Sequence, residues 1–110
     1  MIISKTKTYT HIKPTKISVV QFFASLKERH KEFKGQHLII DFSDKINIEI
    51  KEILLFLDLS VQYRKNGTSF VLVCEDISID DIPDELNVVP TFNEALDILE
   101  MDAIERDLGF

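Results

Sequence analysis

The feature that most constrains the fold of this 110-residue chain is the alternation of short apolar runs with helix-type patterns. The apolar runs are rich in Ile, Leu, Val and Phe, and runs of this length are typical of strands buried inside a sheet. Strands separated by helices predict parallel pairing, because a parallel connection needs a crossover of helix length. The strand-type runs cover residues 37–43, 69–74 and 87–89, and the helix-type patterns cover 18–34, 47–65, 79–86 and 91–108.

Residues 2–12 are β-branched and aromatic and contain no Gly, Pro or Asn, which predicts one long strand. Its alternate positions Lys5, Lys7 and His11 are polar, so we expect one face of this strand to be solvated and the strand to lie at an edge. The whole pattern predicts an α/β fold with a single-layer, mainly parallel sheet of about four strands and four helices. At this length the chain is expected to form one domain, 1–110.

Charge is distributed unevenly along the chain, which carries a net charge of −6. Residues 1–37 hold eight Lys or Arg against two Glu, whereas residues 38–110 hold five Lys or Arg against seventeen Asp or Glu. An acidic chain of this kind is a poor partner for DNA or RNA. The longest apolar run, 53–57, is far shorter than the ~20 residues that span a bilayer, and a single Cys forms no internal disulfide. These features predict a soluble, cytoplasmic protein with no membrane span and no nucleic-acid partner.

The residue types needed for catalysis do not form a recognisable set. The sequence contains no P-loop, no Gly-x-Ser-x-Gly and no Gly-x-Gly-x-x-Gly, and its three His show no metal-ligand spacing. The acidic stretch 75–85 lacks the central Gly of a calcium loop. Cys74 lies in an apolar strand without an adjacent base, so we expect a buried, unreactive thiol. The sequence therefore predicts a protein that is not an enzyme and that has no metal and no cofactor.

Three segments resemble the STAS domain, the family named for sulphate transporters and anti-sigma factor antagonists. The family has an apolar strand followed by Asp-Leu-Ser-Gly, a short loop, and Asp-Ser-Ser-Gly-Leu at the start of a helix. Residues 40–53 align with this pattern without a gap and read Ile-Asp-Phe-Ser-Asp, Lys-Ile-Asn-Ile and Glu-Ile-Lys-Glu-Ile. Residues 65–67 resemble the family's basic-x-Gly turn and residues 91–96 resemble its closing helix, so the resemblance extends over residues 15–108.

The resemblance implies a protein–protein interaction domain, with an anti-sigma factor, a kinase-like protein or another regulatory protein as its partner. In regulatory STAS proteins a kinase phosphorylates the first Ser of Asp-Ser-Ser-Gly, and that position is Ile50 here. Isoleucine has no hydroxyl, so we expect no switching at Ile50, and Ser43 in the neighbouring loop is the alternative acceptor. The family commonly opens with two strands, whereas residues 2–12 predict one. Homodimer formation stays open.

The pattern over 47–65 carries apolar residues on two faces of one helix, with Asn47 as the expected N-cap. One stripe contains Ile50, Ile53, Leu54, Leu57 and Val61, and the other contains Leu55, Phe56, Leu59 and Tyr63. We expect the first stripe to face the core and the second to be covered by neighbouring helices or by a partner. Glu49 and Glu52 either favour the helix dipole or supply permanent charge where relatives acquire phosphate. The predicted partner-binding residues are Asn47, Ile48, Glu49, Ile50, Lys51, Glu52, Leu55 and Leu59.

A second class of function is consistent with the same pattern. Open parallel sheets bind ligands at the carboxyl ends of their strands. Side chains that follow two of the predicted strands would build a small-ligand or enzymatic site there, and these are Asp41, Ser43, Glu75 and Asp76. Acidic and hydroxyl side chains without a base make a poor anion site, and we therefore favour the interaction domain.

Overall fold

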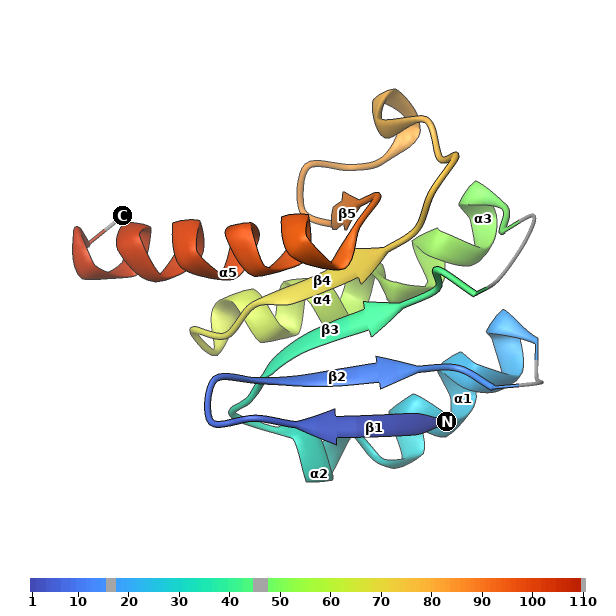
Figure 1. Cartoon of the computed structure of the whole chain (residues 1–110), viewed down its shortest axis with the longest axis horizontal. Coiled ribbons are helices and arrows are strands. Elements are labelled where there is room, and N and C mark those ends of the chain that lie inside the picture. Colours follow the sequence, from blue (N-terminus) through green and yellow to red (C-terminus); the bar gives the residue numbers. More distant parts are fainter. Residues whose placement is uncertain (16–17, 45–47, 110) are drawn as a thin grey trace.

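The computed structural model describes residues 1–15, 18–44 and 48–109. It contains a five-stranded sheet in the order β1-β2-β3-β4-β5, seen face-on in Figure 1. The strands are β1 (Ile2–Lys5), β2 (Tyr9–Lys13), β3 (His37–Asp41), β4 (Phe70–Val73) and β5 (Asn87–Val89). The helices are α1 (Val19–Glu28), α2 (His30–Phe33), α3 (Ile50–Ile53), α4 (Leu57–Lys65) and α5 (Phe92–Asp107), with 3-10 turns η1 (Leu54–Phe56) and η2 (Ile79–Asp81).

Strand pairing follows the predicted pattern. β2, β3, β4 and β5 pair in parallel, and β1 pairs antiparallel with β2. The sheet is therefore mainly parallel, and the N-terminal strand lies at its edge. These features confirm the predicted α/β fold class, with five strands where about four were expected.

The prediction of one long strand over residues 2–12 is wrong, because the chain turns after Lys5 and forms a β1–β2 hairpin. Thr6 supplies the turn that Gly or Asn would otherwise make. Its Oγ1 accepts hydrogen bonds from the backbone N–H groups of Thr8 (3.1 Å) and Tyr9 (3.0 Å). A Thr side chain can close such a turn without any residue that interrupts the strand pattern, which is why the sequence concealed it.

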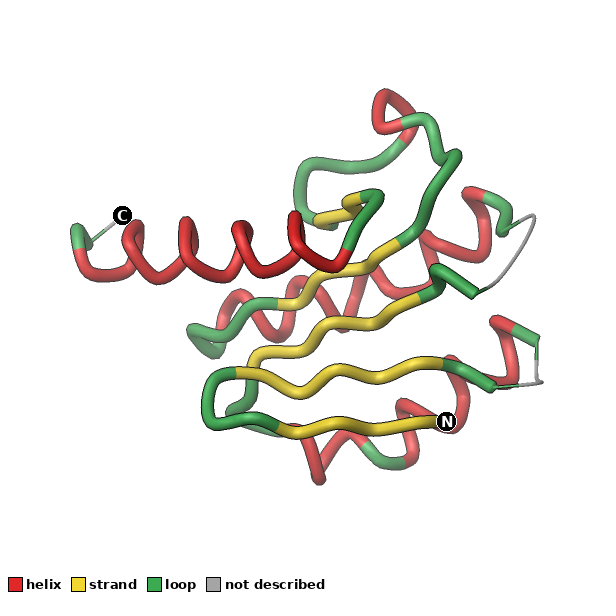
Figure 2. The backbone as a smooth tube through the Cα atoms, viewed as in Figure 1, coloured by secondary structure: helices red, strands yellow, loops and turns green. Residues whose placement is uncertain are grey.

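Helices cover both faces of the sheet (Figure 1). α1, α2, α3 and α4 pack on one face, where the larger core includes Phe22, Phe56 and Leu72. α5 packs on the other face and extends past the ends of the strands (Figure 2). The smaller core between α5 and the sheet contains Ile39, Val71, Val73, Ala95 and Leu99.

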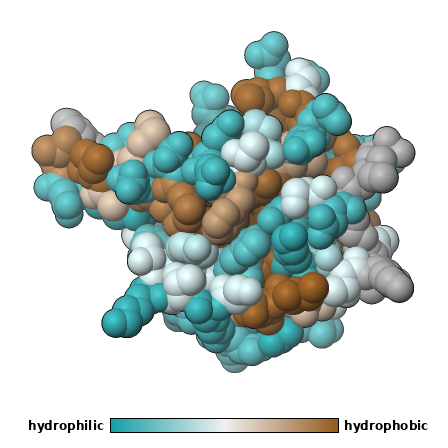
Figure 3. Space-filling view, viewed as in Figure 1, coloured by the Kyte–Doolittle hydropathy of each residue, from teal (hydrophilic) through white to brown (hydrophobic). Residues whose placement is uncertain are grey.

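The face that carries α5 has a mixed surface. Apolar atoms gather along α5 and, as a separate patch, over β1, where Ile2 is 57% exposed (Figure 3). Polar side chains surround both patches. None of the described helices has the length and the apolar character needed to cross a lipid bilayer.

Two predicted helix starts are confirmed by their capping contacts. Ser18 and Gln21 form a reciprocal capping box at the start of α1, with both hydrogen bonds at 3.1 Å. At the start of α5, Thr91 Oγ1 accepts the backbone N–H of Glu94 at 3.2 Å. Each contact satisfies an N–H group that the helix leaves without an internal partner.

Three predicted helices differ from the structure in extent. The segment 18–34 is divided at Arg29 into α1 and α2, and the segment 47–65 contains α3, η1 and α4 in succession. The segment 79–86 shortens to η2. It stops there because Ile82 precedes Pro83 and is extended (φ −101°, ψ 130°), as a residue before proline prefers to be.

The core-facing side of the segment from α3 to α4 is not the predicted one. The buried apolar side chains are Ile53, Phe56, Leu59 and Tyr63. Phe56 and Tyr63 pack on Phe70, with ring centroids 6.4 and 5.3 Å away, and aromatic rings bury more apolar area than leucines do. Their stripe therefore faces the sheet, and the predictions that Leu54 is core and that Leu59 is available to a partner are wrong.

Candidate functional site

The loop after β3 begins with Asp41, whose carboxylate is fully engaged by the protein. Its Oδ1 accepts the backbone N–H of Ser43 at 2.8 Å, and its Oδ2 lies 2.8 Å from Nε2 of His11 on β2. Burial raises the pKa of Asp41, but the hydrogen bonds from Ser43 and from His11 outweigh it and hold the pKa below its usual value. Asp41 is therefore a buried, charged residue whose carboxylate links β3 to β2 and to the following loop by hydrogen bonds.

His11 was expected on a solvated strand face, and this expectation is wrong. The imidazole is 20% exposed, because it is held between Asp41 and the ring of Phe92, whose centroid lies 4.7 Å away. Phe92 is the first residue of α5, so α5 shields one end of the β2 face. The start of the loop after β3 is thus held by Asp41 on β3 and His11 on β2, and His11 is in turn packed against Phe92 on α5.

The start of α3 carries the predicted pair of glutamates. Glu52 Oε1 accepts the backbone N–H of Glu49 at 2.9 Å, and the carboxylate of Glu49 lies 3.1 Å from Nζ of Lys51. Ile50 lies between the two glutamates in the sequence, at the position that the resemblance assigns to a phosphoacceptor. Its side chain is half-buried. Both carboxylates therefore have local partners: Glu52 caps the helix, and Glu49 pairs with a lysine on the surface. Asn47, the predicted N-cap, lies outside the described residues, and Glu49 is the N-cap of α3.

The remaining predicted partner-binding residues differ in exposure. Ile48 and Leu55 are half-buried and pack against the larger core. Leu54, which the sequence placed inside, is 38% exposed. It belongs to a solvent-facing stripe whose other members are polar. The stripe consists of Lys51, Leu54, Asp58, Gln62 and Lys65.

The alternative ligand site at the carboxyl ends of the strands gains little from the geometry. Asp41 already has its partners, and Glu75 and Asp76 are exposed on the loop after β4. Asp76 has a positive φ of 59°, a conformation that Asp tolerates in turns. Within the described ranges, no group of three or more His, Cys, Asp or Glu side chains gathers where a metal ion would bind.

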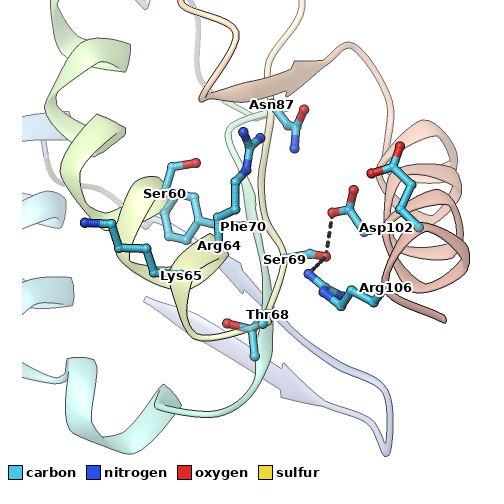
Figure 4. A pocket seen from close by; sticks show the side chains of 11 residues that line it. Ser60, Arg64, Lys65, Thr68, Ser69, Phe70, Asn87, Asp102 and Arg106 are labelled. Carbon is cyan, nitrogen blue, oxygen red and sulfur yellow. Dashed lines mark hydrogen bonds between the residues drawn. The ribbon is translucent and has the colours of Figure 1, made fainter. Parts of the chain in front are cut away.

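A Ser, a His and an Asp meet at the opposite end of the strands, beside the first residues of β3 and β4; Figure 4 shows Ser69 and Asp102 of this group. Ser69 Oγ donates to Oδ2 of Asp102 at 2.7 Å, but it is the backbone N–H of Ser69 that donates to Nδ1 of His37 at 2.9 Å. A nucleophilic serine needs a base on its hydroxyl, and this hydroxyl has a carboxylate instead. Ser69 is also only 2% exposed, so the three residues are structural and do not form a catalytic triad.

Cys74 is buried, as the sequence predicts. Burial, together with the negative charges of Asp76 and Glu75, raises the pKa of its thiol to about 11. The thiolate is the reactive form, so this environment disfavours nucleophilic chemistry.

The fold matches a solved structure of RsbS from Moorella thermoacetica, in a variant with a serine replaced by glutamate. The TM-score is 0.66 at 20% sequence identity, and the match covers 93% of this chain and 96% of that chain. RsbS is a STAS-domain anti-sigma factor antagonist. The fold is STAS-like. No protein-family model matches the sequence, and no curated protein does.

The STAS-like fold confirms the resemblance predicted from residues 40–53. In this STAS-like arrangement, the segment that resembles Asp-Ser-Ser-Gly-Leu follows β3 and opens α3. The N-terminal β1–β2 hairpin also corresponds to the two strands with which the family commonly opens. The sequence pattern had predicted a single strand there.

Proposed function

We propose that this chain is a non-catalytic, STAS-like protein–protein interaction domain of the anti-sigma factor antagonist type. The observation that carries the proposal is the likeness to RsbS over nearly the whole of both chains. The proposed domain comprises residues 1–110 and acts in the cytoplasm, with a regulatory protein such as an anti-sigma factor or a kinase-like protein as its partner.

The proposed docking surface combines the start of α3 with the outward side of η1. It offers Glu49, Ile50 and Lys51 beside the exposed part of Leu54. An apolar side chain among charged residues is the arrangement from which protein interfaces are built, with a dry centre and a polar rim. Leu54 takes the role that the sequence had assigned to Leu59, because Leu54 is the leucine that solvent reaches.

This domain is proposed not to be switched by phosphorylation at the family position, since Ile50 has no hydroxyl. Ser43 is exposed, but its backbone N–H donates to the Asp41 carboxylate, and a phosphate there would lie next to that negative charge. Incubation with native cell extract and ATP, followed by peptide mass mapping, tests this point. Stoichiometric phosphate on Ser43 would restore a switch in the neighbouring loop and contradict the wider proposal that phosphorylation does not switch this domain.

The decisive experiment is affinity capture from the native cell with three baits. Wild type is compared with Leu54→Asp and with Ile104→Asp, whose side chain is an exposed apolar group (59% exposed) on α5. We expect wild type and Ile104→Asp to retain the same regulatory protein and Leu54→Asp to lose it. Urea unfolding of all three baits shows whether they are equally folded. If Leu54→Asp retains the protein, or Ile104→Asp loses it, the proposed surface is wrong.

A further inference from the structure

A polar pocket of about 350 Å³ lies between the last turns of α4 and α5 (Figure 4). It lies at the end of the strands opposite the loop after β3. Its floor is formed by the first residues of β4 and β5, and its volume is in the range of small-molecule sites. The pocket shares no residue with the proposed docking surface. Its charged and polar side chains are Ser60, Arg64, Lys65, Thr68, Ser69, Asn87, Asp102, Glu105 and Arg106.

Positive charge is concentrated at this pocket. Residues 38–110 contain only five Lys or Arg, and three of them, Arg64, Lys65 and Arg106, line it. Asp102 and Glu105 also line the pocket, and Lys65 points away from it, so two arginines stand beside two carboxylates there, whereas the whole chain has a net charge of −6. Basic residues also complement the dipole at a helix C-terminus, and all three lie in last turns. Dipole compensation alone, however, does not require two helices to bring their guanidinium groups to one hollow.

The two arginines have hydrogen-bonding capacity to spare. Arg64 extends toward Asn87, while Lys65 points the other way (Figure 4). Among the described residues, Arg64 makes no ion pair and no side-chain hydrogen bond. Arg106 donates one N–H to Ser69 Oγ at 3.2 Å, and a guanidinium has five. The carbonyl of Tyr63, in the last turn of α4, is already satisfied, since it accepts from Thr68 Oγ1 and from the backbone N–H groups of Asn66 and Thr68.

The hydroxyls of Ser60 and Thr68, on the α4 side of the pocket, can only accept from a ligand. Ser60 Oγ donates to the carbonyl of Glu85 at 2.7 Å, and Thr68 Oγ1 donates to that of Tyr63 at 3.0 Å. Each hydroxyl has one proton, so what remains toward the pocket is acceptor lone pairs. A ligand that fits this lining has an anionic group for the arginines and O–H groups for Ser60 and Thr68.

From these contacts we infer that the pocket binds a small hydroxylated phosphate monoester, with Arg64 and Arg106 on the phosphate. Arginine forks match phosphate oxygens in pairs, and a dianion suits two guanidiniums better than a single carboxylate does. Asp102 and Glu105 are negative, so the O–H groups of the ligand, and not its phosphate, are placed toward these carboxylates.

The test is titration of the folded protein with ribose 5-phosphate and, separately, with inorganic phosphate, followed by calorimetry and by amide NMR shifts. We expect shifts at Ser69, Asn87 and the ends of α4 and α5, and weaker binding of inorganic phosphate. Arg64→Gln removes a surface side chain and should weaken binding by about tenfold or more, the loss expected for charge-assisted hydrogen bonds. Arg29→Gln, which removes a guanidinium that pairs with Glu32 elsewhere, is the matched control and should bind as wild type does.

Three results would overturn the inference. The first is an absence of shifts at millimolar ribose 5-phosphate, and the second is equal affinity of wild type and Arg64→Gln. The third is equal affinity of the two ligands, which would remove the role assigned to Ser60 and Thr68. Arg106→Lys keeps the charge and one donor for Ser69 but loses the fork. If Arg64→Gln were to unfold, weaker binding by Arg106→Lys would support the inference and unchanged binding would contradict it.

Discussion

His11 Nε2 and Asp41 Oδ2 lie 2.8 Å apart and join neighbouring parallel strands at their carboxyl ends. This contact sits directly beneath the loop that leads to α3, because Ser43 donates its backbone N–H to the same carboxylate. The first residues of the loop after β3 are thus held by a charge buried in the sheet. Charge-assisted hydrogen bonds of this kind are stronger than neutral ones.

Asp41→Asn should lower the free energy of unfolding at pH 7 by about 1–3 kcal/mol, since it replaces a charged acceptor and sets an amide against His11. The folded pKa of Asp41 lies below its ordinary value, which for an unfolded chain is about 3.9. Its contribution is therefore fully present above that value and is lost as the pH falls through the folded pKa. Urea unfolding at several pH values measures this.

Asp44→Asn is the control for that series. Asp44 pairs with Lys13 at 3.3 Å on the surface, where its side chain is 77% exposed. A pair of this kind contributes at most about 1 kcal/mol. A difference between wild type and Asp41→Asn that stays constant from pH 7 to acid would contradict the assigned role of Asp41.

Leu59→Ala should destabilise the protein by about 2–5 kcal/mol, as for a buried leucine, because its side chain is 6% exposed. Leu54→Ala removes a group that solvent already reaches, and it should cost about 1 kcal/mol or less. Chemical unfolding of the two variants compares the two faces of this helical segment directly. Equal losses would mean that both leucines are core.

Glu52→Gln should leave stability within about 1 kcal/mol of wild type, because the amide oxygen can still accept the N–H of Glu49. If Glu52 only caps α3, affinity for the captured partner should also stay the same at low and high salt. If its charge stands in for a phosphate, affinity should change, and the change should shrink as salt screens exposed charges. The salt series therefore separates the two roles of this carboxylate.

Cys74 should react slowly with thiol reagents in the folded protein at pH 8, since burial and the nearby acidic charges raise its pKa to about 11. Urea should expose the thiol and restore the rate of an ordinary cysteine. Ellman's reagent gives the rate as an absorbance change. Rapid reaction without denaturant would show that the strand end opens readily.

The parts of the fold that followed from the sequence are those with one strong local cause. Strands β3 and β4 are continuous apolar runs, and the N-caps of α1 and α5, Ser18 and Thr91, are each followed three residues later by Gln or Glu, as in a capping box. The hairpin turn was missed because Thr6 closes it with its side chain, and threonine is also a common residue in strands. No periodic pattern distinguishes these two uses of threonine.

The candidate sites depended on causes that are not local. Two apolar stripes share one helical segment, and the choice between them rests on the rings of Phe56 and Tyr63 meeting Phe70 across the core. The pocket brings together Arg64 and Arg106, which are far apart in the chain. The scarcity of bases after residue 37 was visible in the sequence, and it was the one signal that could have drawn attention to them.

α5 is held by the smaller of the two cores, on a face where the described residues place no other helix. Such an element has its own opening free energy, below that of the sheet it covers, so its amides should exchange with deuterium before those of β3 and β4. Opening of α5 would also remove Arg106 from the pocket and Phe92 from His11. Opening of this one helix would then remove contacts at both ends of the strands at once. An anion bound in the pocket should therefore slow amide deuterium exchange in the loop after β3.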